Sequence, residues 1–380
     1  MTSFAGFSSF QKQTMKILDK YILKKILSTF FFVVLILMSI VTVIDLTEKM
    51  DKYSRNNLDT LTILGYYADF LPWIAGLITP ITVFIAIVFV TSQMAARTEI
   101  IAILSSGVSF MRMLYPYFIG AAILAVISFY FNGWIIPKSN RNRMEFEMRY
   151  FNKNYSVDRK NVHMQVEPNV YLYLQNYNNQ SNIGYQFSLE KFKDNRLIEK
   201  LTADNIQWDT TKQKWTLKYW KKKGVDSLFT TTGKSLIHQL SESGDALDTT
   251  LVISPKDFAN DQSDYAGMTI PELKKHITKM KFRGSTGVEA FETEIHIRYA
   301  TPFTIFVLVF MGVIVSSRKS RGGTGFQIAL GFLLSFVFII FFMITRTFAE
   351  AGFPPPIVAA WLPNITFTIV SLAMYKFVPR

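Results

Sequence analysis

The stretch ILSTFFFVVLILMSIVTVI, residues 26–44, contains no charged side chain and decides the class of this protein. A helix needs about 20 mostly apolar residues to cross the hydrocarbon core of a membrane, and this stretch is long enough to do so. It lacks the small-residue cleavage site of a secretory signal peptide, so we expect it to remain in the mature protein. The sequence therefore predicts an integral membrane protein.

Further uncharged runs of similar length follow along the chain, and a long polar stretch separates the third run from the fourth. Of the 380 residues, 49% are hydrophobic and 18% are charged. This overall composition is an average over apolar membrane spans and a polar soluble segment. We predict three spans on each side of one soluble domain. The six predicted spans are residues 26–44, 71–96, 113–137, 299–317, 322–345 and 351–375.

Basic residues beside the spans predict the direction of the chain, since short loops rich in Lys and Arg stay in the cytoplasm. On the opposite side acidic and basic residues balance, and the long central domain translocates largely regardless of its charge. We expect both termini in the cytoplasm and the central domain outside, which in a bacterium is the periplasm. The basic residues assigned to the cytoplasmic side are Lys12, Lys16, Lys20, Lys24, Lys25, Arg97, Arg112, Arg318, Lys319, Arg321, Lys376 and Arg380.

The central domain alternates apolar and polar residues in short bursts, a pattern typical of half-buried strands. Many short strands without a strong helix between them predict a sandwich, a jelly roll or an open barrel. We expect strands at residues 170–174, 185–189, 214–220 and 250–253, and turns at residues 178–182, 193–195, 209–211 and 223–224.

The strand domain ends at Thr269-Ile-Pro-Glu272, which has the spacing of a helix capping box with proline in the tolerated first turn. This helix is expected to run to about Phe282. Gly284 and Gly287 follow it, and we interpret the segment as a hinge before the fourth span.

No motif in the chain predicts an enzyme. Gly233-Lys234-Ser235 resembles the end of a phosphate-binding loop, but Leu228 stands where that loop needs a glycine, so we interpret it as a strand turn. Without a nucleotide site, ATP-driven work would need another subunit. Cysteine is absent, which excludes a disulfide framework and a cysteine nucleophile. We expect no metal, because the histidines lack ligand spacing and no clustered carboxylates complete a metal shell. We also expect no cofactor and no nucleic-acid partner. The histidines are His163, His238, His276 and His296.

The loop between the second and third spans reads RTEIIAILSSGVSFMR, residues 97–112, and predicts a short amphipathic helix that stops at Gly107. Two interpretations stay open on these residues alone. The helix either lies on the lipid surface, or it docks to a cytoplasmic partner and presents Glu99 with an apolar face. That face would consist of Ile100, Ile103 and Leu104.

The order of these features resembles the lipopolysaccharide-export permeases, the LptF/LptG family, over nearly the whole chain. The residues that carry the resemblance are Leu18-Asp19-Lys20-Tyr21-Ile22, Arg97-x-Glu99 with Gly107, the segment 268–284, and Gly352-x-Pro-Pro with Trp361-Leu-Pro-Asn364. With it we predict a membrane protein whose six-helix bundle, three plus three, holds an inserted all-β, jelly-roll-like periplasmic domain.

Three domains follow from this prediction. Residues 1–137 hold the cytoplasmic flank and the first three spans, with a coupling helix at about 97–110. Residues 138–267 form the periplasmic β domain, and residues 268–380 hold a linker helix and the last three spans.

The resemblance implies one half of the membrane part of an ATP-binding-cassette exporter in the bacterial inner membrane. Such an exporter extracts lipopolysaccharide and passes it to a periplasmic bridge. The implied partners are a paralogous permease, LptF or LptG, a cytoplasmic LptB-like ATPase dimer, LptC- and LptA-like bridge proteins, and lipopolysaccharide itself. The residues implied in coupling to the ATPase are Arg97, Glu99, Ile100, Ile103, Leu104 and Gly107.

Basic residues at the outer ends of the spans are candidate contacts for lipid phosphates, and spans one and five are candidate lateral walls of a lipid cavity. Arg346 could instead form an ion pair with Glu350, one helical turn further along the chain. Asp45 stands where some members carry a lysine, so Lys49 or Lys52 would replace that contact. The candidates are Lys49, Lys52, Lys138, Arg141, Arg143, Arg298 and Arg346.

Two alternatives to this function remain. One is the membrane half of another envelope lipid or lipoprotein exporter of the same ATP-driven class, although the lipoprotein-release permeases have four spans. The other is a non-transporting envelope scaffold or sensor. Co-purification with an ATPase subunit would separate an exporter from a scaffold.

Overall fold

The structure is a computed structural model that describes residues 16–151, 159–178, 181–194, 196–228, 236–251, 253–255, 258, 265–284, 287–317 and 323–376. The chain divides into a helical unit, Met1–Asn140 with His296–Arg380, and a strand-bearing unit, Arg141–Ile295. The Gly233-Lys234-Ser235 motif lies outside the described residues, as do Lys12, Arg318, Lys319, Arg321 and Arg380.

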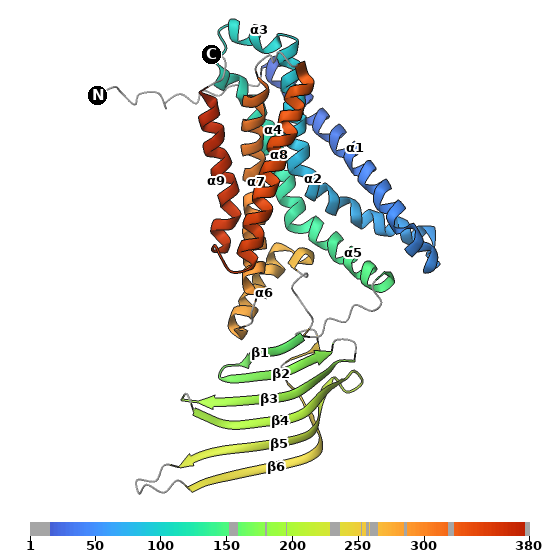
Figure 1. Cartoon of the computed structure of the whole chain (residues 1–380), viewed down its shortest axis with the longest axis vertical. Coiled ribbons are helices and arrows are strands. Elements are labelled where there is room, and N and C mark those ends of the chain that lie inside the picture. Colours follow the sequence, from blue (N-terminus) through green and yellow to red (C-terminus); the bar gives the residue numbers. More distant parts are fainter. Residues whose placement is uncertain are drawn as a thin grey trace, which may run out of the picture. The chain divides into compact units, whose positions relative to one another are not determined.

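Six helical segments in the described part of the chain are long and apolar enough to cross a membrane, which confirms the predicted spans (Figure 1). Three precede the strands and three follow them. In chain order they are α1 (Ile17–Arg55), α2 (Thr60–Ala96), the continuous segment Phe110–Tyr150, α7 (Val288–Ser316), α8 (Gly323–Glu350) and α9 (Pro356–Tyr375).

The third segment is longer than the sequence predicted. It consists of α4 (Phe110–Tyr130), a π-helical turn η1 (Phe131–Ile135) and α5 (Ile136–Tyr150), so helix continues past Pro137. In the π-helical turn the N–H of Ile136 donates to Phe131 O. Pro137 directly follows this interruption of the regular ladder, where its missing N–H costs little.

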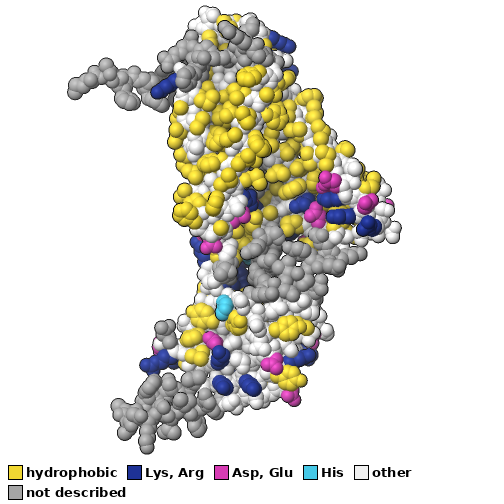
Figure 2. All heavy atoms as spheres, viewed as in Figure 1, with side chains coloured by type: hydrophobic (Ala, Val, Ile, Leu, Met, Phe, Trp, Pro, Cys, Tyr) yellow, Lys and Arg dark blue, Asp and Glu magenta, His cyan; other side chains and the backbone are white. Residues whose placement is uncertain are grey.

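Apolar side chains cover the surface of the helical unit in a broad band, as Figure 2 shows. A water-soluble protein rarely exposes a contiguous apolar surface of this extent, whereas a lipid-facing surface requires it. The exposed side chains of α1 and α8 include Phe31, Phe32, Leu35, Ile40, Val43, Phe332, Leu333, Phe336, Met343 and Phe348.

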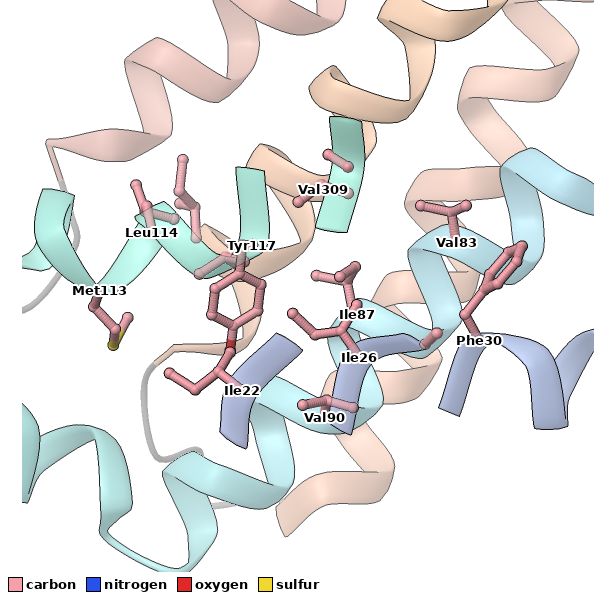
Figure 3. Close-up of a cluster of buried hydrophobic side chains, with 14 of the residues drawn as sticks. Ile22, Ile26, Phe30, Val83, Ile87, Val90, Met113, Leu114, Tyr117 and Val309 are labelled. Carbon is pink, nitrogen blue, oxygen red and sulfur yellow. The ribbon is translucent and has the colours of Figure 1, made fainter. Parts of the chain in front are cut away.

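The core of the helical unit joins the first half of α1 to α2, α4 and α7. Figure 3 shows Ile22 beside Tyr117 and Ile26 beside Ile87, with Val309 of α7 in the same cluster. After Phe30, no residue of α1 is buried before Tyr53. Most of this helix is therefore held by its two ends.

Small residues allow the helices behind this core to approach closely. A Cβ atom on Gly312 of α7 would lie 2.9 Å from Ile87 Cγ2 of α2, and one on Gly331 of α8 would lie 3.1 Å from Val88 Cγ2. Membrane helices commonly associate through such small residues, because lipid provides little hydrophobic drive between them.

The strand-bearing unit confirms an inserted all-β domain. Its strands form one antiparallel sheet in sequential order from β1 to β6, so the described strands make a meander and not two separate sheets. The strands are β1 (Arg159–Glu167), β2 (Val170–Asn178), β3 (Ile183–Lys193), β4 (Arg196–Asp209), β5 (Lys214–Leu228) and β6 (Leu236–Thr249).

Two local predictions in this unit are wrong. The expected turn at residues 223–224 lies inside β5, where Gly224 pairs with Glu199 of β4 and Leu240 of β6. Of the expected strand at residues 250–253, the described residues Thr250, Leu251 and Ile253 follow β6 without joining the ladder. Instead Ile253 O accepts a hydrogen bond from the indole of Trp215 at 2.8 Å, which fixes this segment against the core of the sheet.

One face of the sheet is apolar, as period-two alternation predicts. Leu172 and Leu174 of β2 are buried, while Tyr171 beside them is exposed and Tyr173 between them is half-buried. Trp215 lies at the centre of the buried face, with its ring against Tyr177 and Phe258. The indole hydrogen bond satisfies the one polar atom of this large side chain.

Helix α6 (Ile270–Arg283) begins with the predicted capping box. Glu272 Oε2 accepts from Thr269 N and from Thr269 Oγ1, both at 2.8 Å. The side chain of Arg141 also donates to Glu272 Oε2 at 2.8 Å and to Gly267 O. Burial opposes ionisation of Glu272, but these hydrogen bonds outweigh it and hold the pKa of the carboxyl below its usual value.

Candidate coupling loop and lipid-facing side chains

The loop between α2 and α4 turns sharply on both sides of a short helix, α3 (Glu99–Ser105). Before it, Thr98 adopts φ of 62°, and after it Gly107 adopts φ of 86°. Glycine tolerates such a conformation, whereas a β-branched threonine is strained in it, so the start of the helix is fixed by its surroundings. Ser109 then caps α4 by accepting from Arg112 N at 3.3 Å.

The apolar side of α3 faces the core of its own protein. Ile100 is 1% exposed, and Ile103 and Leu104 pack against the cluster that contains Ile22 and Ile26. Ile100 is therefore covered by the chain itself, whereas Ile103 and Leu104 are half-buried, and a role of this face in docking stays a prediction. An apolar stripe predicts that one side of a helix is buried. It does not show whether that side packs against the same chain or against a partner protein.

Other side chains of the loop point outward. Arg97, Ala102, Ser105 and Gly107 are exposed, and Ile101 is 52% exposed. A partner approaching this loop would meet this surface.

Glu99 contacts the beginning of α1. Its Oε2 accepts from Tyr21 Oη at 3.2 Å and lies 3.6 Å from Lys25 Nζ. Lys25 Nζ also donates to Tyr21 Oη at 2.8 Å. The three side chains form one polar network between α1 and the start of α3.

A second polar contact joins α1 to the other end of the loop. Arg112 of α4 donates to both carboxylate oxygens of Asp19, at 2.7 and 2.6 Å. Asp19 is 2% exposed, and its Oδ2 also accepts from Lys16 N at 2.9 Å. Such a two-point contact fixes both distance and orientation.

The loop lies at the same end of the helical unit as the beginning of α1 and the end of α9. Asp19 reaches Arg112, and the ring of Tyr375 lies 6.0 Å from that of Phe110 (Figure 1). The first span therefore begins, and the last span ends, at the same end of the helical unit.

At the far end of α1, Lys49 is neutralised within the chain. Its Nζ lies 2.7 Å from Asp45 Oδ1, contacts the hydroxyl of Tyr66, and sits 5.7 Å from the ring centre of Phe70. Asp45 Oδ2 accepts from Tyr67 Oη at 3.1 Å. Asp45 and Lys49 thus form a local ion pair.

The other candidate phosphate contacts are distributed over both units. Arg141 and Arg143 belong to the strand-bearing unit, where Arg143 pairs with Glu147 at 2.8 Å. In the helical unit, Lys52 and Lys138 are exposed and Arg298 is 4% exposed. The predicted pair of Arg346 with Glu350 is confirmed, at 2.8 Å.

A family model described as the lipopolysaccharide export system permease LptF/LptG matches residues 20–376. The chain belongs to the LptF/LptG family. Two relatives are the proteins named lipopolysaccharide export system permease protein LptG from Escherichia coli strains K12 and O6:H1. Each is 20% identical over 364 residues, which cover 95% of this chain and 98% of the relative.

As an LptF/LptG permease, the chain is a lipopolysaccharide export permease subunit and a multi-pass protein of the inner membrane. Members of the family are transport permeases, so the chain is classed with transporters and not with enzymes. The resemblance predicted from the sequence is confirmed.

The contact that sequence reasoning missed in this LptF/LptG permease is Asp19 with Arg112. Asp19 was noted only as part of a motif, and Arg112 only as a marker of orientation. A signal was present, because an acidic residue at the start of an apolar span is costly to bury without a cationic partner. Sequence alone does not identify that partner among the many basic residues nearby.

Proposed function

We propose that this LptF/LptG permease is one half of the membrane part of an ATP-driven exporter. It takes lipopolysaccharide from the inner membrane and passes it to a periplasmic bridge toward the outer membrane. The observation that supports this best is the family match over residues 20–376, combined with an apolar α1 that is buried only near its ends. A carrier of acyl chains needs such a surface open to the side.

The lipid cavity in this proposal has α1 and α8 as lateral walls. Exposed Phe31 and Leu35 of α1, and Phe332 and Phe336 of α8, would contact acyl chains or the second permease half. Burying apolar side chains against acyl chains is favourable without any specific geometry. The two walls therefore suit a lipid with variable chains.

The polar head of the lipid would lie at the outer ends of the spans, where cations attract phosphate. Lys52 and Lys138 are candidates in the helical unit because both are exposed. Lys49 contributes less charge, because Asp45 lies 2.7 Å from it. Arg141, Arg143, Arg298 and Arg346 remain candidates, and each would have to exchange or share its present partner.

Energy would come from a cytoplasmic LptB-like ATPase dimer bound at the α2–α4 loop. The docking surface would consist of exposed Arg97, Ile101 and Gly107, while Glu99 holds the loop on α1. The same end of the unit would then be cytoplasmic, together with both termini.

The remaining assignments complete the proposal. A paralogous LptF or LptG forms the second half, and LptC- and LptA-like proteins receive the lipid from the β domain in the periplasm. Residues 1–137 hold the cytoplasmic flank and the first three spans, residues 138–267 form the periplasmic β domain, and residues 268–380 hold the linker helix and the last three spans. The chain itself has no catalytic role.

Mild-detergent purification of the tagged chain, followed by mass spectrometry of bound proteins and lipid, tests this function. We expect an ATPase subunit, a paralogous permease and lipopolysaccharide in the complex. A scaffold or sensor would purify without an ATPase, and that result would contradict the proposal.

Glu99→Ala tests the role assigned to the loop. Loss of the contacts with Tyr21 and Lys25 should free the start of α3 from α1. In a reconstituted complex we expect ATP hydrolysis to continue while lipopolysaccharide release falls several-fold. Unchanged release would show that the loop is not the coupling element.

A further inference from the structure

We propose that the Asp19–Arg112 ion pair transmits movement of the α2–α4 loop to α1. The inference rests on the proposed function, because it assumes that an ATPase acts on this loop. Both side chains are positioning residues, since neither touches lipid or nucleotide in this account. The contact joins residues that are 93 positions apart in the chain.

The loop connects α2 to α4 in the chain, but its polar side chains bond to α1. Glu99 at its beginning bonds to Tyr21, and Arg112 just after its end bonds to Asp19. The two contacts lie on the first turns of α1. A force on the loop is therefore delivered at two points to a helix that the loop does not directly join.

Apolar packing makes the loop and the beginning of α1 one block. Ile100 of α3 and Ile22 and Ile26 of α1 belong to a single buried cluster. Close-packed interiors deform little, so the block is expected to move as a rigid body. The bidentate geometry of Arg112 on Asp19 fixes its orientation as well as its position.

Between Phe30 and Tyr53 no residue of α1 is buried, and Phe32, Leu35 and Val43 are exposed. A continuous helix carries a displacement of its first turns along its length. The part that moves therefore carries exposed apolar side chains, and an acyl chain or the second permease half would lie against it. The ion pair thus connects the loop to the wall of the proposed cavity.

Stability alone is a poor reason for such a pair. Removing a carboxylate and a guanidinium from water costs about as much as their attraction returns, and apolar replacements are often as stable. A fixed geometry between two separate segments is what the pair supplies and an apolar contact would not. The test must therefore measure coupling as well as folding.

The first test uses the whole exporter complex in proteoliposomes and measures lipopolysaccharide released per ATP hydrolysed. Asp19→Asn removes the charge, and Arg112→Lys keeps the charge but loses the two-point geometry. We expect both to lower the ratio several-fold while ATP hydrolysis stays within about twofold of wild type. Lys212→Gln, which breaks an exposed pair with Asp248 in the strand-bearing unit, should leave the ratio unchanged.

Unchanged ratios in both Asp19→Asn and Arg112→Lys would overturn the inference and leave the proposed function intact. A wild-type complex that releases no lipid on ATP hydrolysis would instead overturn the proposed function, and the inference with it. The two failures are therefore distinguishable in one experiment.

A second test follows movement directly and does not require a variant at the ion pair. The chain has no cysteine, so spin labels can be placed at two chosen positions. Labels at exposed Ile101 of the loop and Ile36 of α1 should keep their distance when nucleotide binds. Labels at Ile40 of α1 and Ile369 of α9 should change theirs. Independent movement of the loop and α1 would overturn the inference.

Discussion

Asn364 of α9 provides a quantitative test of how the helical unit is held together. The side chain is 5% exposed and makes two hydrogen bonds to α7. Its Oδ1 accepts from Thr304 Oγ1 at 2.8 Å, and its Nδ2 donates to Ala300 O at 3.0 Å. We predict that Asn364→Leu, which removes both bonds at similar volume, destabilises the unit.

The magnitude follows from the number of bonds. A polar contact between membrane helices contributes about 0.6 kcal/mol on average and at most about 1.7 kcal/mol. Two such bonds predict a loss of about 1–3 kcal/mol in the free energy of unfolding for Asn364→Leu. Thr304→Val breaks one of them and should lose about 0.6–1.7 kcal/mol.

The double variant Thr304→Val/Asn364→Leu isolates the contact between the two side chains. Once one partner has gone, removing the other costs less, because no buried polar group is left without its bond. The double variant should therefore be more stable than the sum of the single losses predicts, by about 0.6–1.7 kcal/mol.

Equilibrium unfolding of the purified full chain in mixed micelles of mild detergent and dodecyl sulfate measures these free energies. Thr368→Val is the matched control, because among the described residues Thr368 Oγ1 bonds only within its own helix, to Asn364 O at 2.6 Å. It should change stability by less than about 0.5 kcal/mol. Additivity of the single losses within about 0.5 kcal/mol would refute the contact.

Three further predictions concern other parts of the chain. Gly312→Leu should lower the free energy of unfolding by about 1–3 kcal/mol in the same assay, because even a Cβ atom there would lie 2.9 Å from Ile87 Cγ2. A variant as stable as wild type would contradict this packing. Trp215→Phe removes the donor to Ile253 O and should lower the stability of the strand-bearing unit by about 1–3 kcal/mol. Near-ultraviolet circular dichroism on heating measures this loss. An unchanged melting curve would exclude that bond. The depressed pKa of Glu272 contributes stability that is present above its unfolded value and is lost as pH falls through its lower folded value. Amide hydrogen exchange in α6, which Glu272 caps, should therefore be faster in Glu272→Gln than in wild type at neutral pH. At acidic pH the two exchange rates should be equal. A difference in rate that persists at acidic pH would argue against ionisation of Glu272 as the cause.

The membrane spans were predictable because the signal is local. Six uncharged runs are each long enough to cross a bilayer, and no tertiary information is needed to read them. The continuation of the third span as α5 was missed, because residues beyond Pro137 are polar and proline usually ends a helix. The π-helical turn before Pro137 removes that obstacle, and no sequence pattern announces it.

The strand-bearing unit was predictable in class but less so in detail. Alternation located β2, β3 and β5, whereas the sequence Lys223-Gly224 indicated a turn that the ladder overrides. A glycine between two partner strands is tolerated when its neighbours on both sides are paired. That information lies in β4 and β6 and not in the local sequence.

The candidate site shows the same division. The loop helix and its charged residue Glu99 were predicted from a local pattern, but the side that faces inward was not. An amphipathic stripe on α3 has the same appearance whether Ile100 contacts a partner or its own core. The Asp19–Arg112 pair depends on two segments meeting in space, which only the fold determines.

Lipopolysaccharide release from proteoliposomes tests the central claim most directly. The complex that purifies with this chain is reconstituted with lipopolysaccharide, and transfer to a soluble acceptor is measured with ATP and with a non-hydrolysable analogue. The proposed function predicts release with ATP, none with the analogue, and none when this chain is omitted. Equal transfer with and without ATP hydrolysis, or transfer that does not require this chain, would contradict it.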